Sequence, residues 1–328
     1  MISYFEKIID LLSIGEVVEK TEDLKTTHSL SKNIVVENDW FPRRIGVVDG
    51  GSNVISLNIG YIGVISSIGV IIENNVVVDR VIPKPEVLPI NPDEIFEYET
   101  IDILETIVDR MREALVFETA RKLLSRDIEL LIIDGPIIPY GALGKIVKNT
   151  ESEWFSINKY ENAIINLHND SIKKETSVIG FVKRPRSKYF KTKFYDHIYL
   201  SNYLGEGEYS PDPPGVIDLK TIHEENIRRI AEIIKPKYVF IRLTNSTPPY
   251  RVDLGHLNTD YRKILSYIYT TRTREGIPYA IMKADEEAKI TKRLMREIYD
   301  DVLHYCIYKY LRLDPSRIIP LLPEYGGV

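Results

Sequence analysis

Two apolar stretches of the sequence each end in an aspartate followed by a glycine. They are VVDGG at residues 47–51 and IIDGP at residues 132–136. A carboxylate that follows a buried strand is held rigidly, and neighbouring strands lie about 4.8 Å apart. Asp49 and Asp134 could therefore share divalent cations roughly 3.5–4 Å apart, the spacing of two-metal phosphodiester chemistry. Asp-Gly is also a common turn signal, so the motif alone leaves both interpretations open.

A Mg²⁺ or Mn²⁺ site needs further oxygen ligands. Glu118 lies in VFETARKLL, where its apolar neighbours predict that it faces the sheet; Glu105 and Glu113 belong to the same helical pattern. Asp285 follows an expected strand and opens an expected helix. A single glutamate is more often solvated than a ligand, and an aspartate at a helix start is often an N-cap.

A basic segment, residues 183–193, is the main candidate for binding nucleic acid. It holds six cations and no acid: Lys183, Arg184, Arg186, Lys188, Lys191 and Lys193. Tyr189, Phe190, Phe194 and Tyr195 are interleaved with the cations. Cations neutralise phosphates and aromatic rings stack on unpaired bases. Arg242 and Arg251, on either side of the NSTPP loop, extend this candidate surface. A solvated charged loop is the alternative.

The composition limits the classes of protein that fit. With 328 residues, 44% apolar and 28% charged, the chain suits a globular protein. A net charge of −5 argues against coating nucleic acid by bulk charge, but not against a local basic groove. The single cysteine fits a reducing cytoplasm, and the lack of a long apolar run predicts no membrane helix. Absent glutamine with abundant Lys and Glu indicates a hyperthermophile.

The hydrophobic pattern predicts an α/β chain. Strands are expected at 45–49, 54–72, 76–82, 129–134, 178–183, 238–243 and 278–282, and loops at 205–215 and 245–253. Helices are expected at 2–13, 93–126, 153–168, 219–234, 257–274 and 285–312. A meander followed by alternating strands and helices predicts a mixed sheet flanked by helices. We expect one domain with a core at about 41–290, an N-terminal helix and linker at 1–40, and a C-terminal helix and tail at 286–328.

In their order along the chain, the motifs resemble those of the NurA family of archaeal DNA-end-processing nucleases. The resemblance covers about residues 41–290. It rests on GVVDGGSN (46–53), the glutamate helix (110–124), LLIIDGP (130–136), VIGFVKRPRS (178–187), FIRLTNSTPPYRVD (240–253) and GIPYAIMKADEEAKI (276–290).

The resemblance implies an RNase H-like fold with N- and C-terminal helical extensions. It also implies a Mn²⁺- or Mg²⁺-dependent deoxyribonuclease with two ions per active site. Its activity would be 5′→3′ exonuclease on single- and double-stranded DNA, with endonuclease activity on single strands. Family members form homodimers around a DNA channel. They act with the hexameric HerA helicase-translocase in resecting double-strand breaks, a step of DNA repair by homologous recombination.

Carried over by motif, Asp49 and Asp134 match the two family aspartates. Glu118 is the best match for the helix acid, with Glu113 as the alternative. Asp285 stands where family members often have histidine, which could change the metal preference. Lys183 matches the family lysine and would face a phosphate.

Two further departures from the family pattern are Ile277 in place of a tyrosine and Gly135-Pro136 in place of Gly-Ser. Two other classes of function remain open. An actin- or sugar-kinase-like ATPase shares the RNase H-like core, and a non-catalytic subunit could bind DNA ends. The helices at 2–13 and 285–312 are the expected dimer contacts. The tail at 316–328 is expected to dock on a partner or to pack on its own domain.

Overall fold

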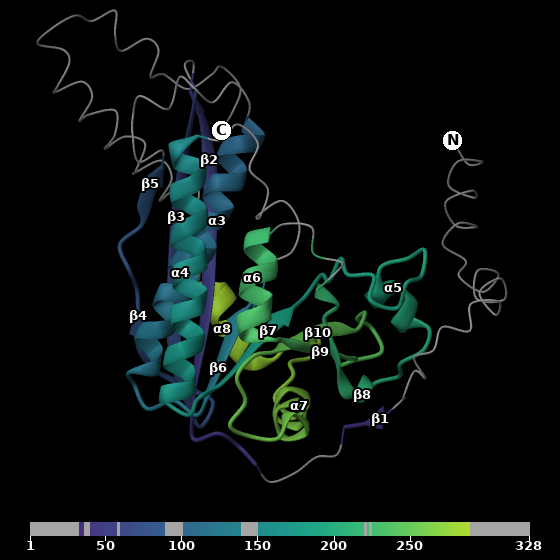
Figure 1. Cartoon of the computed structure of the whole chain (residues 1–328). Helices are drawn as coiled ribbons and strands as arrows, with labels where there is room; N and C mark the ends of the chain where they lie inside the picture. The colour runs from purple at the N-terminus through teal and green to yellow at the C-terminus, as the bar shows by residue number, and fades with distance from the viewer. Residues whose placement is uncertain are drawn as a thin grey trace, which may run out of the picture.

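A mixed ten-stranded β-sheet forms the centre of the molecule (Figure 1). The computed structural model describes residues 33–35, 40–57, 60–88, 101–138, 150–219, 222 and 225–288. The strands are β1 (Asn33–Ile34), β2 (Arg44–Leu57), β3 (Gly60–Glu73), β4 (Val76–Val81), β5 (Glu86–Leu88), β6 (Leu130–Asp134), β7 (Ser177–Val182), β8 (Glu208–Val216), β9 (Lys237–Ile241) and β10 (Tyr250–Leu254). Their order across the sheet is β1-β8-β9-β10-β7-β6-β2-β3-β4, and β5 pairs with β3.

The centre of this sheet is parallel. β6 pairs in parallel with β2 on one side and with β7 on the other, whereas β2 and β3 form a long antiparallel hairpin. The LLIID run of β6 is buried up to its terminal aspartate, as its continuous apolar sequence predicts for a central strand. The predicted α/β class, a mixed sheet flanked by helices, is confirmed.

Helices cover both faces of the sheet (Figure 1). α3 (Ile101–Leu124), α4 (Glu151–Lys173) and α6 (Glu225–Ile234) lie over one face, and α7 (Tyr261–Thr270) and α8 (Tyr279–Ala288) over the other; α5 (Asp196–Ser201) is short. The first core includes Phe117, Tyr160, Ile230, Leu131 and Phe240. The second includes Val47, Ile132, Val252, Ile264 and Ala284. None of the helices described is long and apolar enough to cross a membrane.

Several sequence predictions of local structure are wrong. The expected strand at 278–282 is the start of α8, whose buried residues Ala280, Ile281, Ala284 and Ala288 follow a helical period. The expected loops at 205–215 and 245–253 contain strands β8 and β10. β2 does not end at Asp49 but continues through both glycines. The predicted helix at 2–13, the part of the predicted 285–312 helix after residue 288, and the tail at 316–328 lie outside the described residues.

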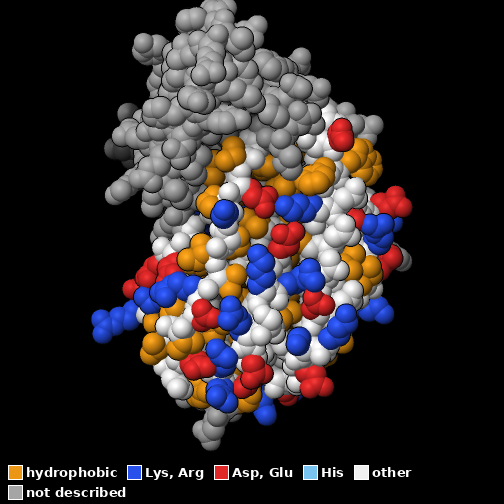
Figure 2. All heavy atoms as spheres, turned by 90° about the vertical axis from the view of Figure 1, so that its left-hand side faces the viewer, with side chains coloured by type: hydrophobic (Ala, Val, Ile, Leu, Met, Phe, Trp, Pro, Cys, Tyr) orange, Lys and Arg blue, Asp and Glu red, His pale blue; other side chains and the backbone are white. Residues whose placement is uncertain are grey.

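The face that carries β4 and β5 is charged but not of one sign. Lys and Arg side chains alternate there with Asp and Glu (Figure 2). Ion pairs join Arg80 of β4 to Glu287 of α8, and Arg126 to Asp79. Exposed valines, Val76 and Val78, lie on the same edge strand. This mixture of charges gives the face no extended positive surface of the kind that attracts nucleic acid.

The turn that follows β6 lies directly on β7. A Cβ atom added at Gly180 would lie 2.5 Å from the carbonyl oxygen of Gly135 and 2.8 Å from the backbone nitrogen of Ile137. These neighbours are backbone atoms, so they cannot move aside as a side chain can. Glycine at position 180 therefore allows the turn after Asp134 to pack on the sheet.

We predict that Gly180→Ala destabilises the protein by about 1–3 kcal/mol, the usual cost of overpacking. The midpoint of urea unfolding measures the change. Gly205→Ala is the control, because its nearest neighbours are carboxylate atoms of the Glu208 side chain, at 3.2 Å or more. Equal effects of the two substitutions would contradict the packing argument.

Candidate metal centre

Asp49 and Asp134 stand where two central strands separate. The parallel ladder pairs Ile45–Val48 of β2 with Leu130–Ile133 of β6 and ends there. The next residue on each strand is an aspartate, so the two carboxylates occupy equivalent positions. Val47 and Ile132 belong to the core under α7 and α8, and side chains alternate along a strand. Both aspartates therefore project from that same face of the sheet.

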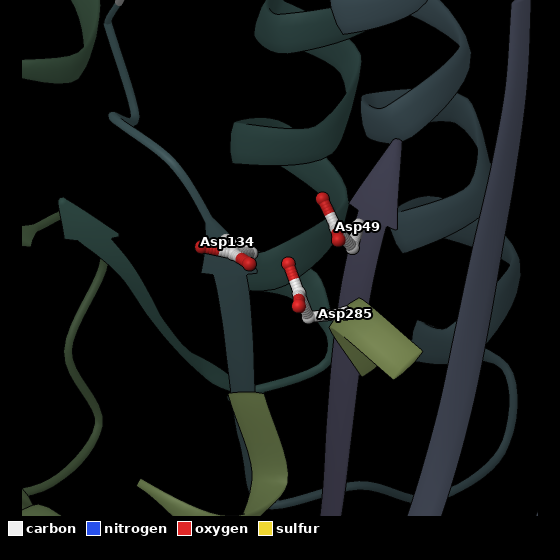
Figure 3. A group of neighbouring side chains, drawn as sticks. All are labelled: Asp49, Asp134 and Asp285. Carbon is white, nitrogen blue, oxygen red and sulfur yellow. The ribbon is translucent and has the colours of Figure 1, made fainter. Parts of the chain in front are cut away.

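Asp285 meets them from the helix that covers this face. It lies in the second turn of α8, not at the helix start as the sequence predicts. One carboxylate oxygen from each of Asp49, Asp134 and Asp285 lies within 4.8 Å of the other two. Figure 3 shows the three side chains pointing toward one another from β2, β6 and α8. The three aspartates that the sequence singles out thus converge on one place.

Lys183, the residue after β7, provides a cation inside this group. Its Nζ lies 2.7 Å from an Asp134 oxygen and 3.2 Å from an Asp285 oxygen. The lysine predicted from the motif is therefore part of the site. Although burial alone disfavours the ammonium form, these two carboxylates raise the pKa of Lys183 above its usual value.

The positive charge at the site does not balance the three carboxylates, and the pKa values of Asp49 and Asp134 are raised. Burial raises the pKa of Asp49 to about 6, and the hydrogen bond from the Gly50 N–H and the charge of Lys183 only partly oppose this. Burial and the neighbouring Asp49 raise the pKa of Asp134 to about 7. A bound divalent cation would stabilise the ionised form of both groups.

The donor set fits a hard divalent cation. All three groups are carboxylates, and oxygen ligands are those preferred by Mg²⁺ and Mn²⁺. Within the described ranges, no histidine or cysteine joins the cluster, so a zinc-type nitrogen or sulfur set is not formed there. Asp49, Asp134 and Asp285 are the residues that would hold the ion.

Glu118 does not join the three aspartates. It lies on α3, which covers the opposite face of the sheet. One turn before it is Leu115, whose cluster packs on β5. Glu113 lies on the same helix, and Phe117 and Ala120, one and two turns later, belong to the core cluster that also contains residues of α4 and β6. Glu118 is thus not part of the cluster of three aspartates, and its metal role stays a prediction, as does that of Glu113.

Arg112, which the sequence analysis missed, connects Glu113 to the surroundings of Asp49. Its guanidinium pairs with Glu113 at 2.7 Å and Asp109 at 3.1 Å, and donates to Ser52 on β2. Its charge also opposes the burial-driven rise in the pKa of Asp49. Burial raises the pKa of Glu113, and Arg112 opposes that shift. An arginine between acidic positions on a helix has no sequence signature, because such spacing is ordinary on solvated helices.

In the basic segment, the charged side chains face solvent, whereas two of the aromatic rings pack in the core. Tyr189 and Phe190 pack inward, with Tyr189 stacked on Tyr238 at 4.2 Å and Phe190 against Phe240. These two rings therefore cannot stack on bases as expected. Tyr195 is 40% exposed. The cations after Lys183 all face solvent: Arg184, Arg186, Lys188, Lys191 and Lys193.

Arg242 and Arg251, the two further cations expected to contact DNA, differ in their burial. The Arg242 guanidinium donates to the backbone carbonyls of Ser201, Leu204 and Asn245, and its contact with DNA stays a prediction. Arg251 is 3% exposed and pairs with Asp253 inside the core. The DNA contact predicted for Arg251 is therefore wrong. Its strand, β10, is buried on both faces, but its charged residues alternate with apolar ones, and in the sequence this alternation looks like a half-exposed strand.

Comparison with protein families finds a match to the NurA domain over residues 43–290. The chain belongs to the NurA family. The motif order recognised in the sequence is thereby confirmed, and with it the RNase H-like fold that the family implies. A comparison with curated proteins gives no significant match.

Solved structures of the family share this fold. The chain is similar to the NurA nuclease from Sulfolobus solfataricus, with a TM-score of 0.65, 15% identity, and coverage of 96% of this chain and 100% of that one. NurA with manganese has a TM-score of 0.57 at 13% identity, covering 98% and 100%. NurA bound to dAMP and manganese has a TM-score of 0.57 at 12% identity, covering 90% and 94%.

We predict that Asp49→Asn stabilises the metal-free protein by roughly 2–5 °C in melting temperature at pH 8, and by less at pH 5. The folded-state pKa of Asp49 lies above its unfolded value, so the stability linked to its proton is present at low pH and lost as pH rises through about 6. Asparagine cannot ionise and keeps its stability. Melting with a chelator at both pH values measures this.

Adding Mn²⁺ should raise the melting temperature of the wild type more than that of Asp49→Asn. Glu232→Gln, an exposed position on α6, serves as the control and should leave every comparison unchanged. A pH-independent effect of Asp49→Asn would contradict the charge argument.

Proposed function

We propose that the protein is a metal-dependent deoxyribonuclease that hydrolyses phosphodiesters with two Mn²⁺ or Mg²⁺ ions. The observation that carries this is the convergence of Asp49, Asp134 and Asp285 at the break between β2 and β6. Membership of the NurA family and the manganese and dAMP in structures of relatives support it.

Each site residue has a distinct role in the proposal. Asp49 would be a ligand shared between the cations, and Asp134, Asp285 and a helix glutamate would complete the ligand set. Bound divalent cations would supply the Lewis-acid chemistry of phosphodiester hydrolysis: activation of water, orientation of the scissile phosphate and stabilisation of the leaving oxygen. Lys183, beside Asp134, would reduce the repulsion between these carboxylates before metal binds. It would also contact a phosphate oxygen of the substrate.

The finer activity follows the family. We infer 5′→3′ exonuclease action on single- and double-stranded DNA, endonuclease action on single strands, and a cytoplasmic role in resecting double-strand breaks. The partners we propose are a second copy of the chain and a HerA-type hexameric translocase. The solvent-facing cations of the basic segment support a DNA substrate, because they follow Lys183 in the chain, and Lys183 contacts the carboxylates.

Asp49→Ala and Asp134→Ala should each lower Mn²⁺-dependent nucleotide release by at least about a thousandfold, because several kcal/mol of metal-supplied stabilisation is lost. The assay uses end-labelled single- and double-stranded DNA with Mn²⁺, Mg²⁺ and chelator lanes, and circular dichroism confirms folding. Glu232→Gln should cut like the wild type. Normal cleavage by both alanine variants, or by the wild type in chelator, would sink the proposal.

Replacing three lysines of the basic segment should weaken DNA binding and its salt dependence. Removing three phosphate contacts lowers the slope of log K against log salt by about 2, at roughly 0.7 per contact with single-stranded DNA. The variant is Lys188→Ala/Lys191→Ala/Lys193→Ala, measured by fluorescence anisotropy in chelator.

The matched control is Lys173→Ala/Lys174→Ala/Lys235→Ala. These lysines precede β7 and β9, at the end of the strands opposite to the carboxylates. Each triple contains one lysine with positive φ, 54° for Lys191 and 49° for Lys235. A slope that falls equally in both triples would place the DNA elsewhere.

A further inference from the structure

A buried ion pair on β10 connects the metal centre with the basic segment. Arg251 and Asp253 lie two residues apart, so both side chains leave the same face of the strand. Arg251 Nε lies 2.7 Å from Asp253 Oδ1, and Nη2 lies 3.1 Å from Oδ2. Their side chains are only 4% and 1% exposed. Burying two charges carries a large desolvation cost, and apolar replacements are often as stable.

Asp253 reaches the turn that follows the metal-binding aspartate. Its Oδ2 accepts a hydrogen bond of 3.3 Å from the backbone N–H of Ile137, three residues after Asp134. The same turn also packs on Gly180 of β7, where there is no room for a Cβ atom. Asp253 is thus one of the groups that fix the direction in which the chain leaves Asp134.

Arg251 reaches the basic segment. Its guanidinium lies 5.8 Å from the centre of the Tyr189 ring, a cation–π distance. The Tyr189 and Phe190 N–H groups donate to the Asp196 carboxylate at 2.8 and 3.1 Å. Burial raises the pKa of Asp196, and Arg251 is among the groups that oppose that rise. Arg251 therefore supports the segment at the point where its aromatic residues enter the core.

We propose that Arg251 and Asp253 are positioning residues, which set the turn after Asp134 and the basic segment in one fixed relation. The pair has two arms that separate chemically. The carboxylate arm holds the metal-binding turn through Ile137, and the guanidinium arm holds the segment through Tyr189. The DNA and Mn²⁺ readouts of this inference rest on the proposed function, whereas the hydrogen-exchange readouts do not.

Two charge-free double variants separate the arms. Arg251→Met/Asp253→Asn removes both charges but keeps a side-chain oxygen that can accept from Ile137 N–H. Arg251→Met/Asp253→Leu has the same shape but no acceptor. Within the ion pair itself, neither variant leaves one charge without its partner, which protects folding; Asp196 loses the charge of Arg251 but keeps its hydrogen bonds from the Tyr189 and Phe190 N–H groups. The readouts are amide hydrogen exchange of residues 135–138 and 184–196, Mn²⁺ affinity by calorimetry, and DNA affinity by anisotropy in chelator.

Both double variants should exchange the amides of 184–196 roughly tenfold faster, as expected when a local support is lost. Both should also bind single-stranded DNA more weakly, by about threefold to tenfold. Only the leucine variant should loosen 135–138 and weaken Mn²⁺ binding, by about tenfold. A purely structural pair would change the melting temperature and move both segments alike in the two variants, and that result would overturn the proposal.

The control is Arg229→Met/Glu161→Gln, which removes an ion pair between α6 and α4 and should alter none of these readouts. If either double variant fails to fold, Tyr189→Leu tests the guanidinium arm alone. It should speed exchange of 184–196 and leave Mn²⁺ affinity unchanged, and unchanged exchange would overturn that arm. A wild type that binds Mn²⁺ but no DNA would refute the proposed function, while the hydrogen-exchange readouts would still decide this inference.

Discussion

The structure depends on holding three carboxylates together with too little positive charge. Asp49 and Asp134 share one register position on parallel strands, and α8 adds Asp285 within 4.8 Å. Burial and mutual repulsion raise the pKa values of both strand aspartates, and Lys183 offsets only part of that effect. The central strands are buried and fixed on both sides, so the carboxylates cannot move apart. The fold thereby keeps a site whose unfavourable charge a divalent cation relieves.

The alternation of side chains along the strands divides the two faces of the sheet. The aspartates share their face with Val47 and Ile132, under α7 and α8, whereas α3 packs on the other face. A glutamate on α3 can therefore approach the carboxylates only past the end of β6. Glu113 is paired with Arg112, which also donates to Ser52 on β2. Glu118 is not part of the cluster of three aspartates.

How far the sequence predicts the site follows from which signals are local. Asp49 and Asp134 end apolar stretches within β2 and β6, and Lys183 follows β7. An apolar stretch and the polar residue that ends it are visible in the sequence. Asp285 joins the two strand aspartates although the sequence predicts a different element for the residues before it. PYAIM has the composition of a short strand, but its buried residues continue a helical period into ADEEA. β10 was missed because Arg251 and Asp253 look solvated. They neutralise one another on one face of the strand, but their burial depends on what packs over that face, which the sequence does not show.

The basic segment shows why an acidic protein can still present a defined positive surface. Bulk attraction is not available at a net charge of −5, so the cations must be concentrated and held in place. The inward rings of Tyr189 and Phe190 anchor the segment in the core, and the Asp196 carboxylate caps their N–H groups. Rings that fill the core are unavailable to bases, but they fix the neighbouring cations. Under the proposed function, this segment would contact the phosphate backbone of DNA rather than its bases.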